Sequence, residues 1–443
     1  MQFKQYPSYK KSGVEWLGDV PEHWQIVRTK DIFNHRKEEA LEDDEIVTAF
    51  RDGQVTLRKN RRTDGFTNSI KEHGYQHINN GDLVIHEMDA FAGAIGVSDS
   101  SGKSTPVYTV CYAKNENINH HFYSHFFRTM AKTGFINSLA KGIRVRSTEF
   151  RWNESRNVYL VEPPKSDQQK IVAFLDTETT RIDNLISKQE KLIELLEEQR
   201  KSIISHAVTK GLNPNAPMKD SGVEWLGEVP KHWSYSSLKY VLKQKKGAIK
   251  SGPFGSHLKS SDMVYSDVKV INQRNVIDKD FIGGDNFISF EKYEELKSFT
   301  IYPKDVLVTT RGTIGKVAQV AEDLPISILH PCLIRIQVDE NKVLFDYINY
   351  FFECEKLSLE QLRYASNAAT IDVIYCENLA SIYLPIPSIS EQNEIIKYLK
   401  DEDIKINKLI SKQKTLIEKL KEYRSSIISH AVTGKIDVRE FVA

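Results

Sequence analysis

Two long stretches of the chain share a frame of positions spaced alternately four and three residues apart, and most of these positions are aliphatic. The exceptions are Glu178, Gln189 and Gln199 in the first stretch and Glu402, Gln413 and Tyr423 in the second. The first stretch is 166–208 and the second is 390–433. A sustained period of about 3.5 residues is typical of the seam of a coiled coil. We therefore expect two long helices of roughly 60 Å each, at about 1.5 Å per residue. The predicted seam residues are Ile171, Leu175, Ile182, Leu185, Leu192, Leu196 and Ile203 in the first helix, and Ile395, Leu399, Ile406, Leu409, Leu416, Leu420 and Ile427 in the second.

Both helices belong to an internal repeat. Residues 12–24 recur at 221–233 with eleven of thirteen positions identical, and 185–209 recur at 409–433 with nineteen of twenty-five identical. The stretches between these motifs show only faint similarity. Internal repetition on this scale indicates a duplicated architecture. The sequence therefore predicts two dissimilar domains, each followed by nearly the same helix.

The expected fold class is α+β, with two mixed domains and two long helices that pair as an antiparallel coiled coil. Two similar halves tend to pair through the same surface, which gives the pair a pseudo-twofold symmetry. The alternative is that each helix packs only on its own domain. The predicted parts are a first domain at 1–165, a first helix at 166–208, a linker at 209–220, a second domain at 221–389, a second helix at 390–433 and a C-terminal tail at 434–443.

The bulk composition excludes several classes of protein. A chain of 443 residues is too long for one ordinary core, which agrees with two domains. The N-terminal residues contain no apolar run of the kind found in signal peptides, and no stretch approaches the roughly 18 apolar residues that span a bilayer. The four cysteines are far apart and form no C-x-x-C pair, so we expect reduced thiols in a cytoplasmic protein without a membrane partner. The net charge is only +1, so binding of nucleic acid would require basic residues to gather on one face.

Motifs for catalysis are missing from the sequence. The Asn/Asp-Pro-Pro-Tyr/Phe tetrad of amino-methyltransferases does not occur. The stretch 96–104 is close to a P-loop, but it has five residues between its glycines where the motif needs four. His121 and His125 have the spacing of a zinc motif without its glutamate, and their surroundings predict an amphipathic packing helix. We therefore expect no catalytic residue, no metal and no cofactor in this chain.

The order of the repeated motifs resembles that of the specificity subunit of type I restriction–modification enzymes. The resemblance is carried by the SGVEWLG-x-VP-x-HW motif, by a P-x3-[DE]-Q entry to each long helix, and by the SIISHAVT sequence near each helix end. The GPFGS stretch at 252–256 and the turn at 312–315 also resemble target-recognition domains of that family. These features, most of them in duplicate, cover essentially the whole chain.

This resemblance implies a DNA-recognition subunit that is not itself an enzyme. Each domain would be a target-recognition domain that reads one half of a bipartite target in double-stranded DNA. The two helices would set the spacing of the half-sites, and the repeated regions would bind two methyltransferase subunits. S-adenosylmethionine, ATP and Mg would belong to those partners and to any endonuclease/translocase subunit that joins. Two alternatives remain: a stand-alone DNA-binding regulator, and a coiled-coil scaffold whose domains bind proteins.

Basic and polar residues of the two dissimilar domains are the predicted DNA contacts. Arginine can hold guanine through two hydrogen bonds and lysine suits phosphate, while glycines let a backbone approach DNA closely. A solvated loop surface is the alternative for each. The predicted contacts are Arg51, Arg58, Lys59, Arg61, Arg62, Arg144 and Arg146 in the first domain, and Lys245, Lys246, Lys250, Ser256, His257, Arg274, Arg311, Arg363 and Asn367 in the second.

Residues of the repeated motifs are the predicted partner contacts, namely Trp16, Trp225, His206 and His430. For the tryptophans, packing of a small module is the stronger interpretation. The two histidines occupy identical SIISHAVT contexts at helix ends, where an interface or helix-terminal role is more common than catalysis.

Overall fold

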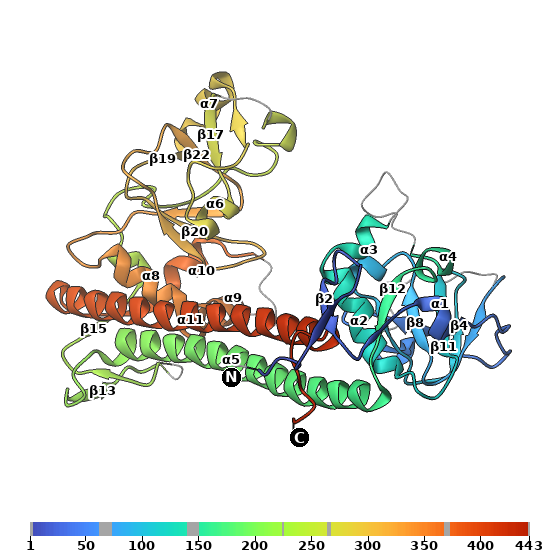
Figure 1. The fold of residues 1–443 in the computed structure, drawn as a ribbon. Coiled ribbons are helices and arrows are strands. Elements are labelled where there is room, and N and C mark those ends of the chain that lie inside the picture. Colours follow the sequence, from blue (N-terminus) through green and yellow to red (C-terminus); the bar gives the residue numbers. More distant parts are fainter. Residues whose placement is uncertain are drawn as a thin grey trace. The chain divides into compact units, whose positions relative to one another are not determined.

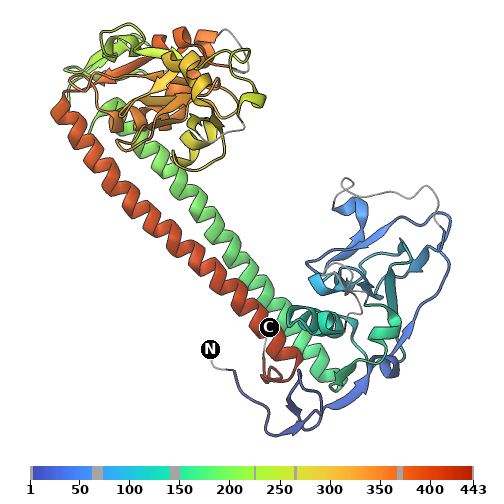
Figure 2. The same ribbon diagram turned by 90° about the horizontal axis from the view of Figure 1, so that it is seen from above.

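The computed structural model describes residues 3–61, 73–139, 150–223, 226–263, 267–366 and 373–441. These residues form two compact units. Unit 1 consists of 1–190 and 414–443, and unit 2 consists of 191–413. The long helices α5 (Lys165–Lys210) and α11 (Ile389–Val432) each contribute to both units. They lie side by side in both views (Figure 1, Figure 2).

Unit 1 is built around a four-stranded antiparallel sheet and the helix α2 (His120–Lys132). The strand order is β4 (Phe33–His35), β11 (Tyr108–Ala113), β8 (Leu83–His86) and β9 (Ile95–Val97). Aromatic residues recur along α2 with the helical period, so one face of the helix is apolar and packs on the sheet. The fully buried aromatic residues of α2 are Phe122, Tyr123, Phe126 and Phe127.

Short elements complete unit 1. Its two-stranded sheets are β1 (Tyr9–Lys11) with β2 (Asp19–Pro21), β3 (Gln25–Arg28) with β12 (Tyr159–Glu162), β5 (Val47–Ala49) with β6 (Val55–Leu57), and β7 (Gln76–Ile78) with β10 (Gly102–Ser104). Its short helices are α1 (Thr29–Ile32), η1 (Arg58–Asn60), η2 (Ala90–Ala92), α3 (Phe135–Ser138) and α4 (Trp152–Ser155).

Unit 2 repeats the central sheet of unit 1 and adds a second one. The repeated sheet is antiparallel, in the order β16 (Ile249–Ser251), β23 (Leu333–Ile336), β20 (Val306–Thr309) and β21 (Val317–Gln319). The added sheet is mixed, in the order β18 (Phe287–Ile288), β17 (Val268–Ile271), β22 (Ser327–Leu329) and β19 (Thr300–Ile301), with β17 and β22 parallel. The added sheet is one physical reason why the two domain sequences match only faintly.

The remaining elements of unit 2 are two-stranded sheets and helices. Its two-stranded sheets are β13 (Met218–Asp220) with β14 (Glu228–Pro230), and β15 (Ser234–Ser237) with β24 (Tyr383–Ile386). Its helices are η3 (Leu238–Val241), η4 (Ser260–Asp262), α6 (Gln273–Asp278), α7 (Phe290–Leu296), η5 (Lys297–Phe299), α8 (Phe345–Glu353), α9 (Glu355–Ser366) and α10 (Cys376–Ser381). The segment predicted as a linker at 209–220 includes β13.

A buried glutamine anchors each long helix to its domain. The Gln168 side-chain oxygen accepts the Asn119 backbone N–H at 2.8 Å, and that of Gln392 accepts the Leu344 N–H at 2.8 Å. Both glutamine side chains are fully buried, so each needs these hydrogen bonds. The glutamine of the P-x3-[DE]-Q motif therefore joins the start of a long helix to the residue that precedes α2 or α8.

The two long helices run antiparallel. In unit 1 the Arg424 side chain of α11 forms an ion pair with Asp183 of α5 at 2.9 Å, and in unit 2 Arg200 of α5 lies 3.6 Å from Asp403 of α11. Residue numbers rise along one helix as they fall along the other, which requires opposite directions. The expected α+β class with an antiparallel helix pair is confirmed.

The register of the helix seam differs from the prediction at three places. Leu192, Leu409 and Leu416 are 39%, 43% and 41% exposed, whereas Ile410 and Ile417 are 7% and 8% exposed. An isoleucine directly follows each of these leucines in the sequence, so two stripes with the same spacing lie side by side on each helix. At these three places the isoleucine packs in the seam, whereas the predicted seam residues Ile182, Leu196 and Ile406 are buried as expected. Periodicity alone could not separate the two stripes.

The two repeated motifs, SGVEWLG-x-VP-x-HW and SIISHAVT, pack against each other in both units. In unit 1 the SIISHAVT end of α11 shares a core with the 12–24 motif, and in unit 2 the end of α5 shares a core with the 221–233 motif. The segment after α11, predicted as a tail, also packs there: Lys435 Nζ donates to the Leu17 carbonyl oxygen at 2.9 Å. Gly434 permits this turn, since its φ is 73° and a Cβ would lie 2.4 Å from Pro21 Cδ.

Candidate nucleic-acid interface

Unit 1 contains a hollow of about 770 Å³ lined by three of the predicted arginines, Arg51, Arg58 and Arg61. Its walls come from β5, from the turn that follows β5, from η1 and from the facing ends of β8 and β11. The three arginines lie within one short sequence segment, and the β5–β6 hairpin with η1 brings them together. The fold therefore gathers these arginines on one concave surface. Binding of nucleic acid by a chain with so low a net charge requires such a local cluster.

A partner in the protein orients each of these guanidinium groups. Arg51 Nη2 lies 2.8 Å from Asp89 Oδ1, and Arg61 Nη2 lies 2.7 Å from Asp52 Oδ2. The Arg61 guanidinium also stacks on the Phe50 ring, 4.2 Å from its centroid. Arg58 donates through Nε to the Thr48 hydroxyl at 3.3 Å. Guanidinium groups held in this way lose less freedom when they bind a planar acceptor.

The charge state of Asp52 reflects this arrangement. Partial burial opposes ionisation of its carboxyl group, but hydrogen bonds from the Arg61 side chain and the Gln54 N–H outweigh burial and lower its pKa. Asp52 is thus a carboxylate at neutral pH and already accepts two donors. A DNA group that binds Arg61 would either displace this carboxylate or use the N–H groups of Arg61 that Asp52 leaves available.

Among the described residues, the one remaining predicted contact of unit 1, Lys59, does not line this hollow. Lys59 forms an ion pair with Glu45. Arg62, Arg144 and Arg146 lie outside the described residues, as do the predicted contact Asn367 and the predicted partner residue Trp225.

In unit 2 the structure brings separate predicted segments to one loop, 330–332. A Cβ on Gly252 would lie 2.1 Å from the His330 carbonyl oxygen, so only glycine fits that approach. Thr310, which precedes Arg311, donates its N–H to the Cys332 carbonyl oxygen at 3.0 Å. Burial, and then the charge of Arg311, lower the pKa of His330. The GPFGS loop and the turn around Arg311 therefore meet at His330.

The remaining candidates of unit 2 differ in how far they are exposed. Arg274 is largely exposed beside Asp278, at 3.1 Å. Lys250 is engaged inside the unit, because its ammonium donates to the Ser298 carbonyl oxygen at 2.7 Å and lies 4.3 Å from the Phe299 ring centroid. The other exposed candidates are Lys245, Lys246, Ser256, His257, Arg311 and Arg363.

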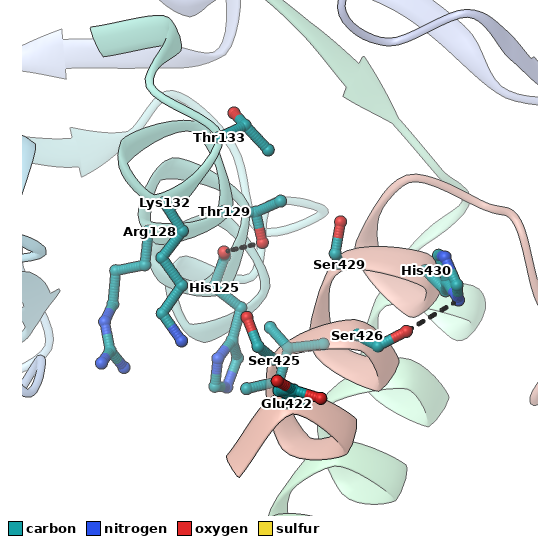
Figure 3. A pocket seen from close by; sticks show the side chains of 11 residues that line it. His125, Arg128, Thr129, Lys132, Thr133, Glu422, Ser425, Ser426, Ser429 and His430 are labelled. Atoms are coloured by element: carbon teal, nitrogen blue, oxygen red, sulfur yellow. Dashed lines mark hydrogen bonds between the residues drawn. The ribbon is translucent and has the colours of Figure 1, made fainter. Parts of the chain in front are cut away.

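The shared helix ends form a groove in each unit. In unit 1 a cavity of about 390 Å³ lies between the end of α11, with His430, and the helix α2 (Figure 3). His125 and Lys132 of α2 point toward Glu422 and Ser425 of α11 in that view. In unit 2 a cavity of about 590 Å³ lies between the end of α5, with His206, and the end of α8. The helix walls are alike in sequence, and the opposite walls differ.

Trp16 packs inside unit 1. Its ring lies 5.5 Å from the Phe126 ring and 5.1 Å from the Phe135 ring, centroid to centroid. These contacts favour the packing interpretation of this tryptophan over partner binding.

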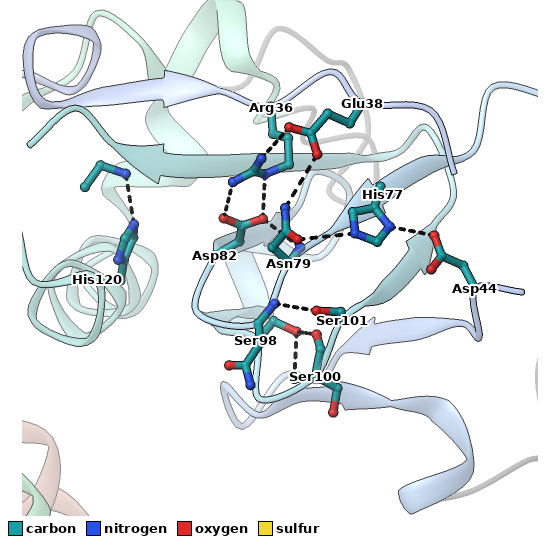
Figure 4. A network of polar contacts seen from close by, with 12 residues as sticks. Arg36, Glu38, Asp44, His77, Asn79, Asp82, Ser98, Ser100, Ser101 and His120 are labelled. Atoms are coloured by element: carbon teal, nitrogen blue, oxygen red, sulfur yellow. Dashed lines mark hydrogen bonds and ion pairs between the residues drawn. The ribbon is translucent and has the colours of Figure 1, made fainter. Parts of the chain in front are cut away.

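A polar network in unit 1 serves the fold (Figure 4). The buried Asp82 carboxylate forms an ion pair with Arg36 at 2.7 Å and accepts the Asn79 N–H at 2.8 Å. His77 Nδ1 lies 2.6 Å from the Asp44 carboxylate. In unit 2, Asp305 lies 3.6 Å from Arg335 in the corresponding strand position. A buried acid that is fully paired in both units stabilises a turn before a strand and leaves no reactive group.

Within the part of the chain that the structure describes, no group of three or more His, Cys, Asp and Glu side chains could hold a metal ion. All four cysteines are free thiols. None of the described helices combines the length and the apolar character that crossing a membrane requires.

One protein-family model matches this chain at two places. The family model described as the type I restriction modification DNA specificity domain matches residues 21–196 and again 230–419. Each match falls mainly within one unit.

Relatives match over most of the chain. The type I restriction enzyme MjaVIII specificity subunit of Methanocaldococcus jannaschii is 25% identical, with 95% of this chain and 94% of that protein covered. The EcoBI specificity subunit of Escherichia coli is 21% identical over 80% of this chain and 73% of that protein.

Solved structures share the fold. A chain from work on complex assembly and conformational transition of the type I R-M system superposes with a TM-score of 0.65 at 15% identity, covering 93% of this chain and 98% of that one. The HsdS subunit from Thermoanaerobacter tengcongensis gives 0.51 at 16% identity, covering 94% and 98%. Because the family model matches most of its length in two copies, the chain belongs to the family of type I restriction–modification DNA specificity subunits.

Proposed function

We propose that this chain recognises a bipartite sequence in double-stranded DNA on behalf of a type I restriction–modification complex and is itself not catalytic. The observation that carries the proposal is the double family match, with one copy in each unit. The two units share a central sheet and differ in the basic residues that they expose. Different surfaces on a common scaffold suit the reading of two different half-sites.

In unit 1 the contacts would come from the hollow with Arg51, Arg58 and Arg61. In unit 2 they would come from the surface around the 330–332 loop, with Arg311 and the exposed residues Ser256 and His257. Arginine forks suit base edges and phosphates, and the small residues of the GPFGS loop allow close approach of its backbone. Lys250 is the weakest of the proposed contacts, since Ser298 and Phe299 already engage its ammonium group.

The helix pair would set the distance between the half-sites. α5 has 46 residues and α11 has 44, so each helix is roughly 65–70 Å long. A pair held by a continuous seam resists bending and sliding, which favours one fixed gap in the DNA target.

The repeated helix surfaces would bind two methyltransferase subunits. Leu192, Leu195 and Leu409 are exposed apolar residues of unit 2, and Leu416 and Tyr423 are exposed in unit 1. Exposed apolar residues on regular spacing indicate a surface that another chain covers. The matching ends of α5 and α11, with His206 and His430, would form part of the same contact.

The chemistry would reside in these partners. S-adenosylmethionine would bind the methyltransferase subunits, and ATP and Mg would bind any endonuclease/translocase subunit that joins. The complex would act on DNA in the cytoplasm.

The test is long-read methylation sequencing of a host that expresses this chain with its methyltransferase subunit. We expect a new split motif with a fixed gap, and its loss when this chain is omitted. If the same methyltransferase subunit is active with another specificity subunit and gives no new motif here, the chain is a regulator or a scaffold. A steep fall of DNA affinity with salt would then separate the regulator from the scaffold.

A further inference from the structure

The hollow of unit 1 contains two residues that the sequence analysis did not single out. His86 is the last residue of β8, and Asp89 follows it in the next turn. Both line the hollow together with Arg51. Residues that add hydroxyl groups to the same lining are Thr48, Thr105 and Tyr108.

The imidazole of His86 is held in one orientation. Its Nδ1 accepts the Asp89 backbone N–H at 3.1 Å, and its ring packs edge-on against the Tyr108 ring, 4.6 Å between centroids. Burial lowers the pKa of His86, and the opposing effect of the Asp89 charge is smaller. The ring is therefore neutral at pH 7. From the hydrogen bond that Nδ1 accepts, we assign the single proton of the neutral ring to Nε2, which is then a donor.

Asp89 positions a second donor. Its backbone N–H holds His86, while its carboxylate holds the Arg51 guanidinium at 2.8 Å. The other carboxylate of the hollow, Asp52, accepts from Arg61 and from the Gln54 N–H. The described lining therefore contains four N–H donor side chains, Arg51, Arg58, Arg61 and His86, against two carboxylates that are each paired with an arginine, so donors are in excess.

The excess of hydrogen-bond donors in the hollow favours a base whose edge presents acceptors. In the major groove guanine presents two neighbouring acceptors, N7 and O6, and no donor. Adenine and cytosine each present an amino group, which needs a free acceptor, and thymine presents one acceptor beside a methyl group. Guanine is the base whose edge matches a surface of donors.

We infer that the hollow of unit 1 recognises a guanine in the first half-site, with His86 Nε2 and the Arg51 guanidinium as donors and Asp89 as the positioning residue. This inference rests on the proposed function and adds to it a base and a residue. His86 is a specificity-determining residue, because a donor of fixed direction distinguishes guanine from bases that present an amino group there.

Two substitutions separate the two nitrogens of the ring. His86→Asn keeps an acceptor near the place of Nδ1 and removes the donor at Nε2, whereas His86→Gln keeps an amide donor near the place of Nε2. His121→Asn, at an exposed position of α2 outside the hollow, is the matched control. Each variant is assembled with the methyltransferase subunit and tested at one salt concentration. The probes are DNA duplexes that contain the target motif identified by methylation sequencing. In each probe one G·C pair of the motif is replaced by A·T.

We expect the wild-type complex and His121→Asn to lose affinity on the order of tenfold at one G·C pair of the first half-site. His86→Asn should lose most of its preference at that pair, retaining only the part that Arg51 supplies, and should keep its discrimination throughout the second half-site. His86→Gln should retain the preference for guanine. Unchanged discrimination by His86→Asn, or a folded His86→Gln complex that has lost it, would overturn the inference. If the wild-type complex prefers no duplex at all, the proposed function itself fails, and the two failures are therefore distinguishable.

Discussion

Arg424 on α11 forms an ion pair with Asp183 on α5, with 2.9 Å between Nε and Oδ1. One repeat earlier, Arg200 on α5 hydrogen-bonds to Asn407 on α11. The same offset of 224 residues relates the two arginines and relates Asp183 to Asn407. Equivalent residues thus make equivalent contacts in the two units, as a pseudo-twofold helix pair requires.

The seam register can be tested on two adjacent residues. Ile410 is 7% exposed and Leu409 is 43% exposed. Ile410→Ala should lower the free energy of unfolding by roughly 2 kcal/mol or more, because it leaves a cavity in the seam. Leu409→Ala should cost less than about 1 kcal/mol, since Leu409 is far more exposed to solvent than Ile410. Urea unfolding followed by circular dichroism measures both values. Equal costs, or a larger cost for Leu409→Ala, would contradict the isoleucine seam.

The buried glutamine at the entry to α5 should be essential to unit 1. Gln168→Leu leaves the Asn119 N–H and the carbonyl oxygens of Asn117 and Pro163 without their partner. We expect a loss of about 1–3 kcal/mol in the free energy of unfolding. The exposed neighbour gives the control, Gln169→Leu, which should change little. Thermal unfolding of both variants and of the wild type measures these changes. A Gln168→Leu protein as stable as the wild type would argue against the anchoring role.

The arginines of the hollow should determine part of the salt dependence of DNA binding. If Arg51 and Arg61 contact phosphates, replacing either by alanine should reduce the slope of log K against log salt by about 0.9. If either contacts a base, the slope stays and discrimination between specific and unrelated DNA falls. The control is Arg181→Ala, an exposed arginine of α5 paired with Glu178. Titrations of the complex at several salt concentrations separate these cases. A variant with unchanged slope and unchanged discrimination would exclude that arginine from the interface.

The length of the helix pair should control the gap between the half-sites. Seven residues added to each helix, after Ile193 and after Gln413, preserve the heptad register and lengthen the pair by about 10 Å. The gap in the methylated motif should grow by up to about three base pairs, with both half-sites unchanged. The same insertion in only one helix breaks the pairing and should abolish specific methylation. A gap that stays the same in the doubly extended protein would contradict the spacing role.

The long helices and their direction could be predicted from the sequence, because the 3.5-residue period is a local signal and the duplication at an offset of 224 residues indicates a pseudo-symmetric pair. The register could not, since the leucine–isoleucine pairs at 409–410 and 416–417 offer two stripes of equal spacing. Which stripe is buried depends on the partner helix, and that information is not local. The packing of the segment around Lys435 on the N-terminal motif was missed for the same reason, since it joins the two ends of the sequence.

Some residues of the candidate site could likewise be predicted from the sequence and others could not. Arg51, Arg58 and Arg61 were found because they cluster along the chain. His86 and Asp89 were missed because a single histidine at a strand end carries no signal until β8 and β5 are placed around one hollow. In unit 2 no motif linked Arg311 to the GPFGS loop. Within the described residues, the 330–332 loop lies against both Gly252 and the turn around Arg311.

The claim that each unit reads one half-site is tested most directly by copying one variable segment into both places. Residues 25–158 are replaced by a second copy of 234–382, and methylated DNA from a host with the methyltransferase subunit is sequenced. We expect a symmetric split motif, in which the half-site of unit 2 occurs twice in inverted orientation with the gap retained. A motif that still contains the original first half-site would contradict the assignment of that half-site to unit 1.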